Sequence, residues 1–168
     1  ETIVDGIGNV IIRKPASPGY ENHPGVILQG HMDMVPQKNN DTVFDFENDP
    51  IEAYVDGEWV TAKGTTLGAD NGIGVAAAMA ILADKSLVHP PLEVLVTVDE
   101  ETGMYGAFAL EGGLLQGKTL LNLDSEAEGE LYVGCAGGVD TTAKFAYTPV
   151  EVEEGDVAVK VSLTGCKG

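Results

Sequence analysis

The sequence contains few basic residues. Among its 168 residues, 9 are Lys or Arg and 27 are Asp or Glu, so the formal net charge is −18. Nucleic acids and anionic membrane surfaces bind proteins through Lys and Arg side chains that neutralise their negative charge. The composition therefore predicts no nucleic-acid partner and no membrane partner. The excess of carboxylates suits a solvated surface or the binding of metal cations.

Long apolar runs and cysteines are also scarce. The longest apolar stretches, such as 75–82, are well short of the roughly 20 residues that a membrane-spanning helix needs. Two cysteines, Cys135 and Cys166, are too few for a secreted disulfide framework, and no signal-peptide pattern stands at the start. These absences predict a soluble protein of the reducing cytoplasm.

Apolar residues are nevertheless numerous enough for a core. They make up 43% of the chain, whereas charged residues make up only 21%. Disorder requires low hydrophobicity together with high charge. A length of 168 residues is usual for one domain, so one folded domain is expected.

Short apolar runs alternate with turn-rich loops and helical segments. Two apolar runs within 2–13 surround Asp-Gly and Gly-Asn, which is typical of a β-hairpin. The composition predicts further strands at 25–29, 59–63, 92–98 and 119–123, helices at 72–84 and 102–115, and an irregular segment at 36–56. Alternating strands and helices predict an α/β fold with a mixed, mostly parallel sheet flanked by helices.

Residue types that bind metals follow three of the predicted strands. His31 and Asp33 follow the first, Glu100 and Glu101 follow the second, and Asp124 follows the third. Open α/β sheets place their ligand site outside the carboxyl ends of the strands. We therefore expect these side chains to converge on one edge of the sheet.

His31 and Asp33 are two positions apart, so in extended backbone they point to the same face. The imidazole could then bind a metal ion while the carboxylate of Asp33 accepts its other N–H and fixes the ring. A surface turn that contains His and Asp is the alternative.

The other acidic positions each have an ordinary interpretation as well. Asp70 or Asn71 stands where a helix N-cap belongs, yet an aspartate there could also bridge two cations. Three adjacent acids at 99–101 repel one another unless something positive offsets them, although a solvated strand end is common. Since neighbouring strand residues alternate in direction, one glutamate could bind a metal while the other acts as a general base. Asp124 could simply begin a polar loop.

Oxygen ligands with one histidine suit zinc, manganese or cobalt, and the histidine favours zinc. Two metal ions that share one aspartate would activate water for hydrolysis. The remaining residues of interest are interpreted as structural. They comprise His23 and His89 in loops and, as packing residues, Trp59, Tyr105 and Cys135.

Four longer segments resemble the bacterial aminoacyl-histidine dipeptidases, which are cytosolic enzymes of the di-zinc exopeptidase clan. They are GHMDMVPQKN (30–39), GTTLGADNGIGVA (64–76), VTVDEETGMYGA (96–107) and LNLDSEAEGELYVGCAGG (121–138). The resemblance spans nearly the whole chain. It implies a zinc-dependent exopeptidase fold and a peptide substrate.

The resemblance also implies roles for individual residues. His31 and Asp124 match ligands of one zinc ion, Glu101 matches a ligand of a second zinc ion, and Asp70 matches the carboxylate that bridges the two. Glu100 matches the general base and Asp33 the acid that orients His31. The Asp70–Asn71 peptide bond is expected to be cis.

The family pattern contains two parts for which this sequence has no match. One is a further histidine that completes the second zinc site, and the other is a lid domain that contacts substrate and forms the homodimer. We therefore expect residues 1–168 to be the first part of a catalytic domain, inactive or nearly so alone.

The predicted activity of the complete protein is metal-dependent hydrolysis of Xaa-His dipeptides, including β-alanyl-histidine. Two alternatives stay open. One is a tripeptidase or another exopeptidase of the same clan, and the other, for these residues in isolation, is a non-catalytic metal-binding module.

Overall fold

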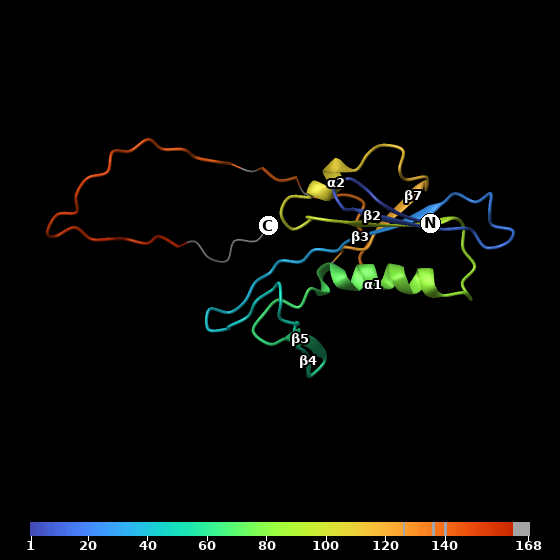
Figure 1. Ribbon diagram of the computed structural model, residues 1–168, viewed down its shortest axis with the longest axis horizontal. Coiled ribbons are helices and arrows are strands. Elements are labelled where there is room, and N and C mark those ends of the chain that lie inside the picture. The colour runs from blue at the N-terminus through green and yellow to red at the C-terminus, as the bar shows by residue number, and fades with distance from the viewer. Residues whose placement is uncertain (126, 136, 140, 163–168) are drawn as a thin grey trace. The chain divides into compact units, whose positions relative to one another are not determined.

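A computed structural model describes residues 1–125, 127–135, 137–139 and 141–162 of the chain. The chain divides into two compact units, residues 1–131 and 132–168. All the helices and strands assigned among the described residues belong to the first unit (Figure 1). The described residues of the second unit contain turns and extended segments, with Val133, Val139 and Phe145 among its exposed side chains.

The first unit is built on a five-stranded sheet. Its order is β1-β2-β6-β3-β7, in which β7, β3 and β6 are parallel and β2 and β1 continue the sheet antiparallel. The sequence-based prediction of a mixed, mostly parallel sheet is confirmed. The strands are β1 (Thr2–Val4), β2 (Val10–Lys14), β3 (Val26–His31), β6 (Leu92–Thr97) and β7 (Thr119–Asn122).

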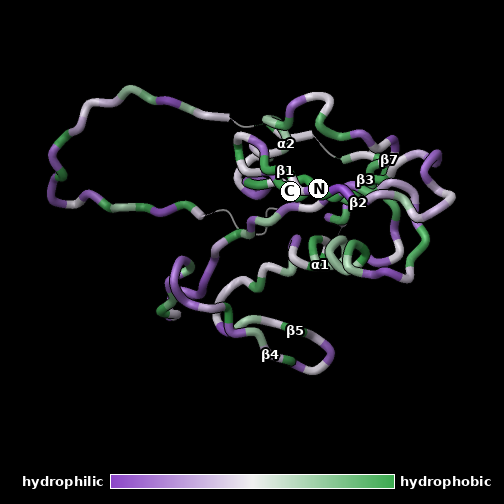
Figure 2. The backbone as a smooth tube through the Cα atoms, turned by 45° about the vertical axis from the view of Figure 1, so that its right-hand side comes forward, coloured by the Kyte–Doolittle hydropathy of each residue, from purple (hydrophilic) through white to green (hydrophobic). Residues whose placement is uncertain are grey.

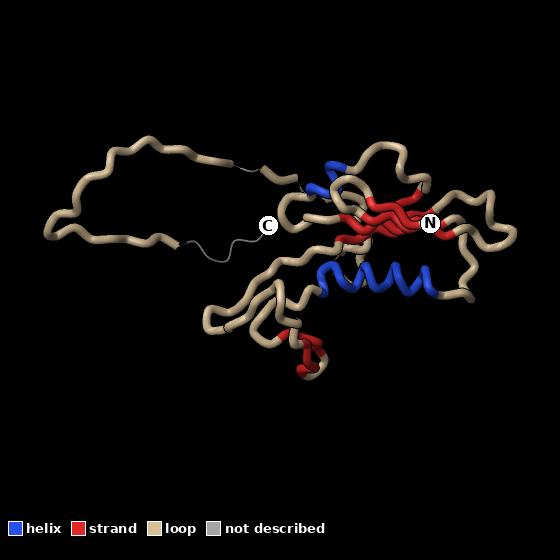
Figure 3. The backbone as a smooth tube through the Cα atoms, viewed as in Figure 1, coloured by secondary structure: helices blue, strands red, loops and turns tan. Residues whose placement is uncertain are grey.

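Helices cover both faces of this sheet. Helix α1 (Ala69–Ala83) runs along one face, as Figure 3 shows in blue against the red strands. Ala78 of this helix packs with Leu28, Val94 and Val96 of the central strands. On the other face Ile11, Ile27 and Leu95 form a second core, covered by the leucines that follow helix α2 (Tyr105–Ala109). Apolar side chains alternate between the two faces because neighbouring strand residues point in opposite directions.

Two predicted helices differ from the observed ones. The helix predicted at 102–115 is only Tyr105–Ala109, because Gly103 (φ 140°) and Gly113 (φ 90°) adopt backbone angles that a right-handed helix does not contain. The helix predicted at 72–84 begins at Ala69, but Asp70 and Asn71 have non-helical angles. From Gly72 onward α1 is drawn in white and green in Figure 2, which marks a helix with almost no hydrophilic residues.

The segment predicted to be irregular, 36–56, ends in a strand. Strand β4 (Ala53–Asp56) pairs antiparallel with β5 (Trp59–Ala62) around a turn at Gly57-Glu58. The prediction missed β4 because this strand has only 4 residues, AYVD, and lies in an acidic stretch. Strand β5 is confirmed.

Three predictions of buried packing are wrong. Trp59 is 77% exposed, because β5 lies in the separate two-stranded sheet, and Tyr105 is 58% exposed at the start of α2. Cys135 is exposed in the second unit. Cys166 lies outside the described residues. Among the residues that the structure describes, no helix is both long and apolar enough to cross a membrane.

Candidate metal site

The parallel pairing of β3, β6 and β7 brings their carboxyl ends to one edge of the sheet. His31 is opposite Thr97, and Gln29 is opposite Asn122. His31 is therefore the last residue of β3, the middle one of the three parallel strands, with the segment that carries Glu100 on one side. The segment that carries Asp124 lies on the other side. The predicted convergence of these residues is confirmed.

His31 is the buried centre of this group, with 1% of its surface exposed. Its Nδ1 lies 2.9 Å from the main-chain oxygen of Asp33, which can only accept a hydrogen bond. Nδ1 therefore carries the proton of the neutral ring. The other nitrogen, Nε2, lies 3.1 Å from Oδ1 of Asp70 and 3.6 Å from Oδ1 of Asp124. It faces the carboxylates, as a metal-binding imidazole nitrogen does.

Asp33 holds the glutamate-bearing segment. Its two carboxylate oxygens accept hydrogen bonds from the main-chain N–H groups of Glu100 and Glu101, each at 3.1 Å. Burial alone would raise the pKa of Asp33, but these two donors, its own main-chain N–H and the charge of His31 together lower it. Its Oδ1 also lies 3.4 Å from Nδ1 of His31. One ionised carboxylate thus links the end of β3 to the segment that follows β6.

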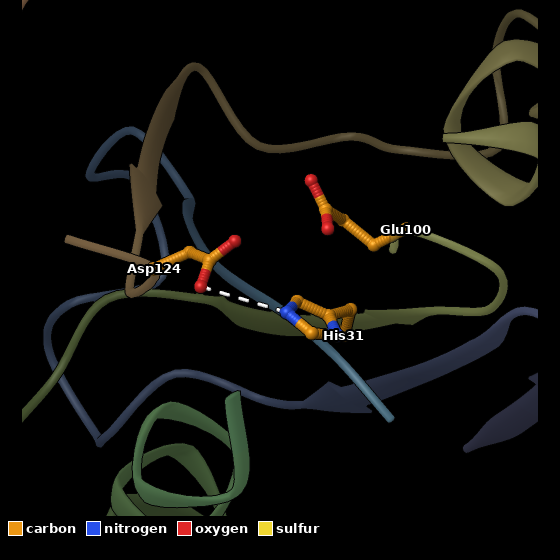
Figure 4. A group of neighbouring side chains, drawn as sticks. All are labelled: His31, Glu100 and Asp124. Atoms are coloured by element: carbon orange, nitrogen blue, oxygen red, sulfur yellow. Dashed lines mark ion pairs between the residues drawn. The ribbon is translucent and has the colours of Figure 1, made fainter. Parts of the chain in front are cut away.

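Five of the candidate residues form two overlapping sets of potential metal ligands. One set is His31, Glu100 and Asp124, whose side chains point toward one another in Figure 4. The other set is His31, Asp70 and Glu101. Within each set the potential ligand atoms all lie within 4.8 Å of one another. Both sets include His31, so a substitution there affects both.

The charges of this group are unbalanced. Burial raises the pKa values of Glu100 and Glu101, and neighbouring carboxylates raise them further. Burial and a hydrogen bond with Asp70 raise the pKa of Asp124. Burial would lower the pKa of His31, but the charge of Asp124 and the hydrogen bond to Asp70 raise it. The contributions of neighbouring carboxylates to these pKa shifts show that negative charge is concentrated here, which favours a bound cation.

The donor set fits zinc. Zinc accepts imidazole nitrogen and carboxylate oxygen in the same site, whereas calcium is bound by oxygen. The buried Nε2 of His31 with several carboxylates around it therefore matches the predicted zinc, with manganese and cobalt as chemically related ions.

Asn71 has a role that the sequence did not indicate. Its side-chain Nδ2 donates to the main-chain oxygen of Leu123 at 2.8 Å and to Asp124 at 2.9 Å. Its Oδ1 accepts from the main-chain N–H of His31 at 3.3 Å. The predicted N-cap role of Asp70 or Asn71 is wrong, because the bonds of the Asn71 side chain go to other segments and Asp70 faces Nε2 of His31. The Asp70–Asn71 peptide bond is cis, as the resemblance implied.

Cavities open on both sides of the site. One of about 300 Å³ is lined by Asp70, Glu101 and Met34, among others. Another of about 260 Å³ is lined by Glu100 and Asp124 together with apolar side chains. Small molecules could therefore approach the carboxylates from two directions.

The two other histidines lie outside the candidate ligand sets. His23 stacks on Tyr20 with ring centroids 5.0 Å apart, and Nδ1 of His89 lies 2.8 Å from the main-chain oxygen of Pro90. Their interpretation as structural residues agrees with these contacts.

The chain is similar to known peptidases over most of its length. Residues 27–162 match the family described as Peptidase family M20/M25/M40. The chain is 59% identical over 164 residues to the cytosol non-specific dipeptidase of Escherichia coli (strain K12), a match that covers 98% of this chain and 34% of that protein. The chain thus spans about a third of the length of this relative.

Solved structures give the same result. The crystal structure of aminoacylhistidine dipeptidase from Vibrio alginolyticus superposes with a TM-score of 0.78 at 64% identity, over 80% of this chain and 28% of that one. Aminopeptidase PepT from Bacillus cereus superposes with a TM-score of 0.61 at 28% identity, over 76% of this chain and 34% of that one. These similarities confirm the resemblance to the aminoacyl-histidine dipeptidases. The chain belongs to peptidase family M20/M25/M40.

Proposed function

We propose that residues 1–168 are the first part of the catalytic domain of a dipeptidase that hydrolyses Xaa-His dipeptides, including β-alanyl-histidine. The observation that carries the proposal is the buried His31, whose Nε2 faces Asp70 and Asp124 at the carboxyl edge of the sheet. Identities of 59% and 64% to proteins named as dipeptidases support the reaction. The name of the second relative supports the histidine preference, and that of the first supports a cytoplasmic location.

The ligand residues would hold two zinc ions, with manganese or cobalt as substitutes. His31 and Asp124 would bind one ion, Glu101 would bind the other, and Asp70 would bridge them. When bound, zinc supplies Lewis acidity to the scissile carbonyl and lowers the pKa of water.

Glu100 is proposed as the general base. Burial and the surrounding carboxylates raise its pKa, so it accepts a proton more readily than an exposed glutamate does. It would take a proton from the attacking water and return it to the leaving amine. Asp33 contributes by binding the main-chain N–H of Glu100, which fixes where that side chain begins.

The proposal includes a longer polypeptide. These residues span 34% of one relative and 28% of another. The remainder would supply the histidine that completes the second zinc site, and a lid domain that contacts substrate and forms a homodimer. We refer to this longer polypeptide as the full-length protein. The 168 residues alone are expected to lack peptidase activity, which an assay with added zinc would check.

Glu100→Gln in the full-length protein tests the mechanism. The amide keeps the size of the side chain but accepts no proton at neutral pH, so kcat is expected to fall by about 10²- to 10⁴-fold. Zinc content is expected to stay unchanged. Glu111→Gln, at an exposed position outside the site, is the matched control. Full activity of the Glu100→Gln protein would overturn the assignment of the base.

A second candidate is a tripeptidase or another exopeptidase of the same clan, which the structural similarity to PepT favours. The two candidates share the metal site and differ in substrate. Values of kcat/KM for β-alanyl-histidine and for a tripeptide, measured on the full-length protein, separate them. A higher value for the tripeptide would reject the Xaa-His preference and leave the metal site unaffected.

A further inference from the structure

The loop that carries Glu100 and Glu101 has an uncommon backbone. It joins β6 to α2, and Asp99 (φ 52°) and Met104 (φ 56°) both adopt left-handed angles that non-glycine residues rarely show. Such angles persist where surrounding contacts fix them. The loop therefore needs anchors near both of its ends.

Asn9 provides an anchor at each end, in addition to the direct main-chain bond that Gly106 N–H donates to the oxygen of Val98 at 3.1 Å. Its Oδ1 accepts the main-chain N–H of Val98, the first residue after β6, at 3.1 Å. Its Nδ2 donates to the main-chain oxygen of Gly106 at 2.9 Å, two residues after Met104. None of its surface is exposed. One buried amide thus ties the end of β6 to the start of α2.

Asn9 is itself fixed by the turn between β1 and β2. Its Nδ2 also donates to Oδ2 of Asp5 at 2.7 Å, and its main-chain N–H donates to Oδ1 of Asp5 at 2.8 Å. Both N–H groups and the oxygen of the amide are therefore used. A Cβ at Gly106 would lie 2.5 Å from Oδ1 of Asn9, so Asn9 and Gly106 pack too closely for any larger residue at position 106.

The middle of the loop has a separate anchor, the carboxylate of Asp33 on the N–H groups of Glu100 and Glu101. We propose that Asn9 is a positioning residue for the peptidase reaction, which holds both ends of this loop so that Glu100 and Glu101 reach the metal site. This inference rests on the proposed function, since it takes Glu100 as the base and Glu101 as a ligand. Asn9 touches neither side chain and acts through the loop backbone.

Asn9→Ala in the full-length protein removes both anchors. The expected result is a fall in kcat of about 10- to 100-fold, since small displacements of a catalytic group have effects of that size. KM is expected to stay within about threefold, because the substrate contacts are not altered. The affinity for zinc, measured by competition with a chromophoric chelator, is expected to fall as Glu101 moves.

Ile11→Val and Ile11→Ala are the matched controls for lost stability. Ile11 is fully buried in β2, two residues after Asn9, and packs against Ile27 and Leu95, away from the loop bonds. If Asn9 only stabilised the fold, the Asn9→Ala protein would have the same kcat as the Ile11 variant whose Tm equals its own. That result would overturn the proposal.

A second variant serves if Asn9→Ala does not fold. The double exchange Asp5→Asn with Asn9→Asp keeps one amide and one carboxylate in the turn and retains an acceptor for Val98. The second carboxylate oxygen of Asp at position 9 then faces the main-chain oxygen of Gly106 and cannot donate to it. The bond to Gly106 is therefore lost, whereas the bond to Val98 is kept. The buried carboxylate also lowers the Tm, so the reference is an Ile11 variant of equal Tm. The proposal expects a lower kcat than that variant has, and an equal kcat would contradict it.

Hydrogen exchange makes the test independent of activity. In the Asn9→Ala protein, amides of 98–106 are expected to exchange faster than in the Ile11 variant of equal Tm, whether or not peptides are hydrolysed. An inactive parent protein would reject the proposed function alone. Unchanged exchange in 98–106 would reject the role of Asn9 alone.

Discussion

The side-chain amide of Asn71 donates a hydrogen bond to Oδ1 of Asp124 across 2.9 Å, and so joins the first turn of α1 to the end of β7. The same side chain accepts the N–H of His31. A residue that is not a candidate ligand therefore sets the spacing of two residues that are. Four predictions follow from the contacts of Asn71, of two glycines in α1, of Glu93 and of His31.

Asn71→Asp is expected to destabilise the full-length protein by about 3 kcal/mol. The new carboxylate cannot donate to the oxygen of Leu123, and it faces Asp124 in a buried position. Chemical denaturation followed by circular dichroism measures the effect. Asn39→Asp, the same change at an exposed loop position, is expected to cost less than about 1 kcal/mol. Equal costs at the two sites would show that the Asn71 bonds contribute little.

Two glycines of α1 are expected to respond oppositely to alanine. A Cβ at Gly74 would lie 2.6 Å from Asn71 Oδ1 and 2.6 Å from the oxygen of Leu123, so Gly74→Ala is expected to destabilise by about 2 kcal/mol. A Cβ at Gly72 meets nothing within 4 Å. Gly72→Ala is therefore expected to stabilise by up to about 1 kcal/mol through helix propensity. Thermal unfolding of the two variants compares them, and a shared sign would refute the packing argument.

Glu93 is expected to make stability depend on pH. It is 4% exposed within β6 and accepts the N–H groups of Gln116 and Gly117 at 2.8 and 2.7 Å, and Nε of Arg13 at 3.1 Å. Burial would raise the pKa of Glu93, but these donors outweigh burial and lower it. Ionised Glu93 therefore stabilises the fold above its unfolded-state pKa of about 4.3, and this contribution is lost as pH falls through the lower folded-state value.

Glu93→Gln measures that contribution. At pH 7 the variant is expected to lose about 2 kcal/mol, because it removes a buried charged acceptor. The difference from the parent protein is expected to shrink as the pH falls below about 4.3. Urea unfolding over a pH series gives both values. A difference independent of pH would show that the charge of Glu93 is not what stabilises it.

His31→Ala is expected to weaken binding of the metal ion assigned to His31 and Asp124, because it removes the nitrogen ligand. Loss of a residue that hydrogen-bonds a metal ligand typically lowers metal affinity by about 10- to 100-fold. Loss of the ligand His31 itself is therefore expected to lower the affinity by more than about 100-fold. Chelator competition measures it. His23→Ala removes an exposed imidazole that stacks on Tyr20 and is expected to leave the affinity unchanged. Retention of zinc by the His31→Ala protein would place the site elsewhere.

Several features of the fold could be predicted because their causes are local. The apolar runs at 25–29 and 92–98 predicted buried strands, and the polar residues that follow them predicted a site at one sheet edge. The helix at 102–115 was predicted too long because composition does not reveal the positive φ angles of Gly103 and Gly113. Trp59 was expected to pack because the sequence does not show that its strand lies outside the main sheet.

The site itself was predicted in its members but not in its contacts. The motifs indicated His31, Asp33, Asp70, Glu100, Glu101 and Asp124. The sequence suggested that Asp33 serves His31, and its Oδ1 does lie 3.4 Å from Nδ1 of His31, but its hydrogen bonds to the N–H groups that follow β6 were not foreseen. Asn71 was considered only as a helix cap, and Asn9 only as a turn residue.

The sequence by itself determined the types of side chain, their position after apolar strands and the resemblance to a peptidase family. These depend on the alternation of residues along a strand and on short motifs, which act within a few residues. Only the tertiary structure decided that Asn71 spaces His31 and Asp124, and that Asn9 holds the loop of Glu100 and Glu101. Those bonds join residues 40 to 97 positions apart, and chain folding alone brings such groups within hydrogen-bonding distance.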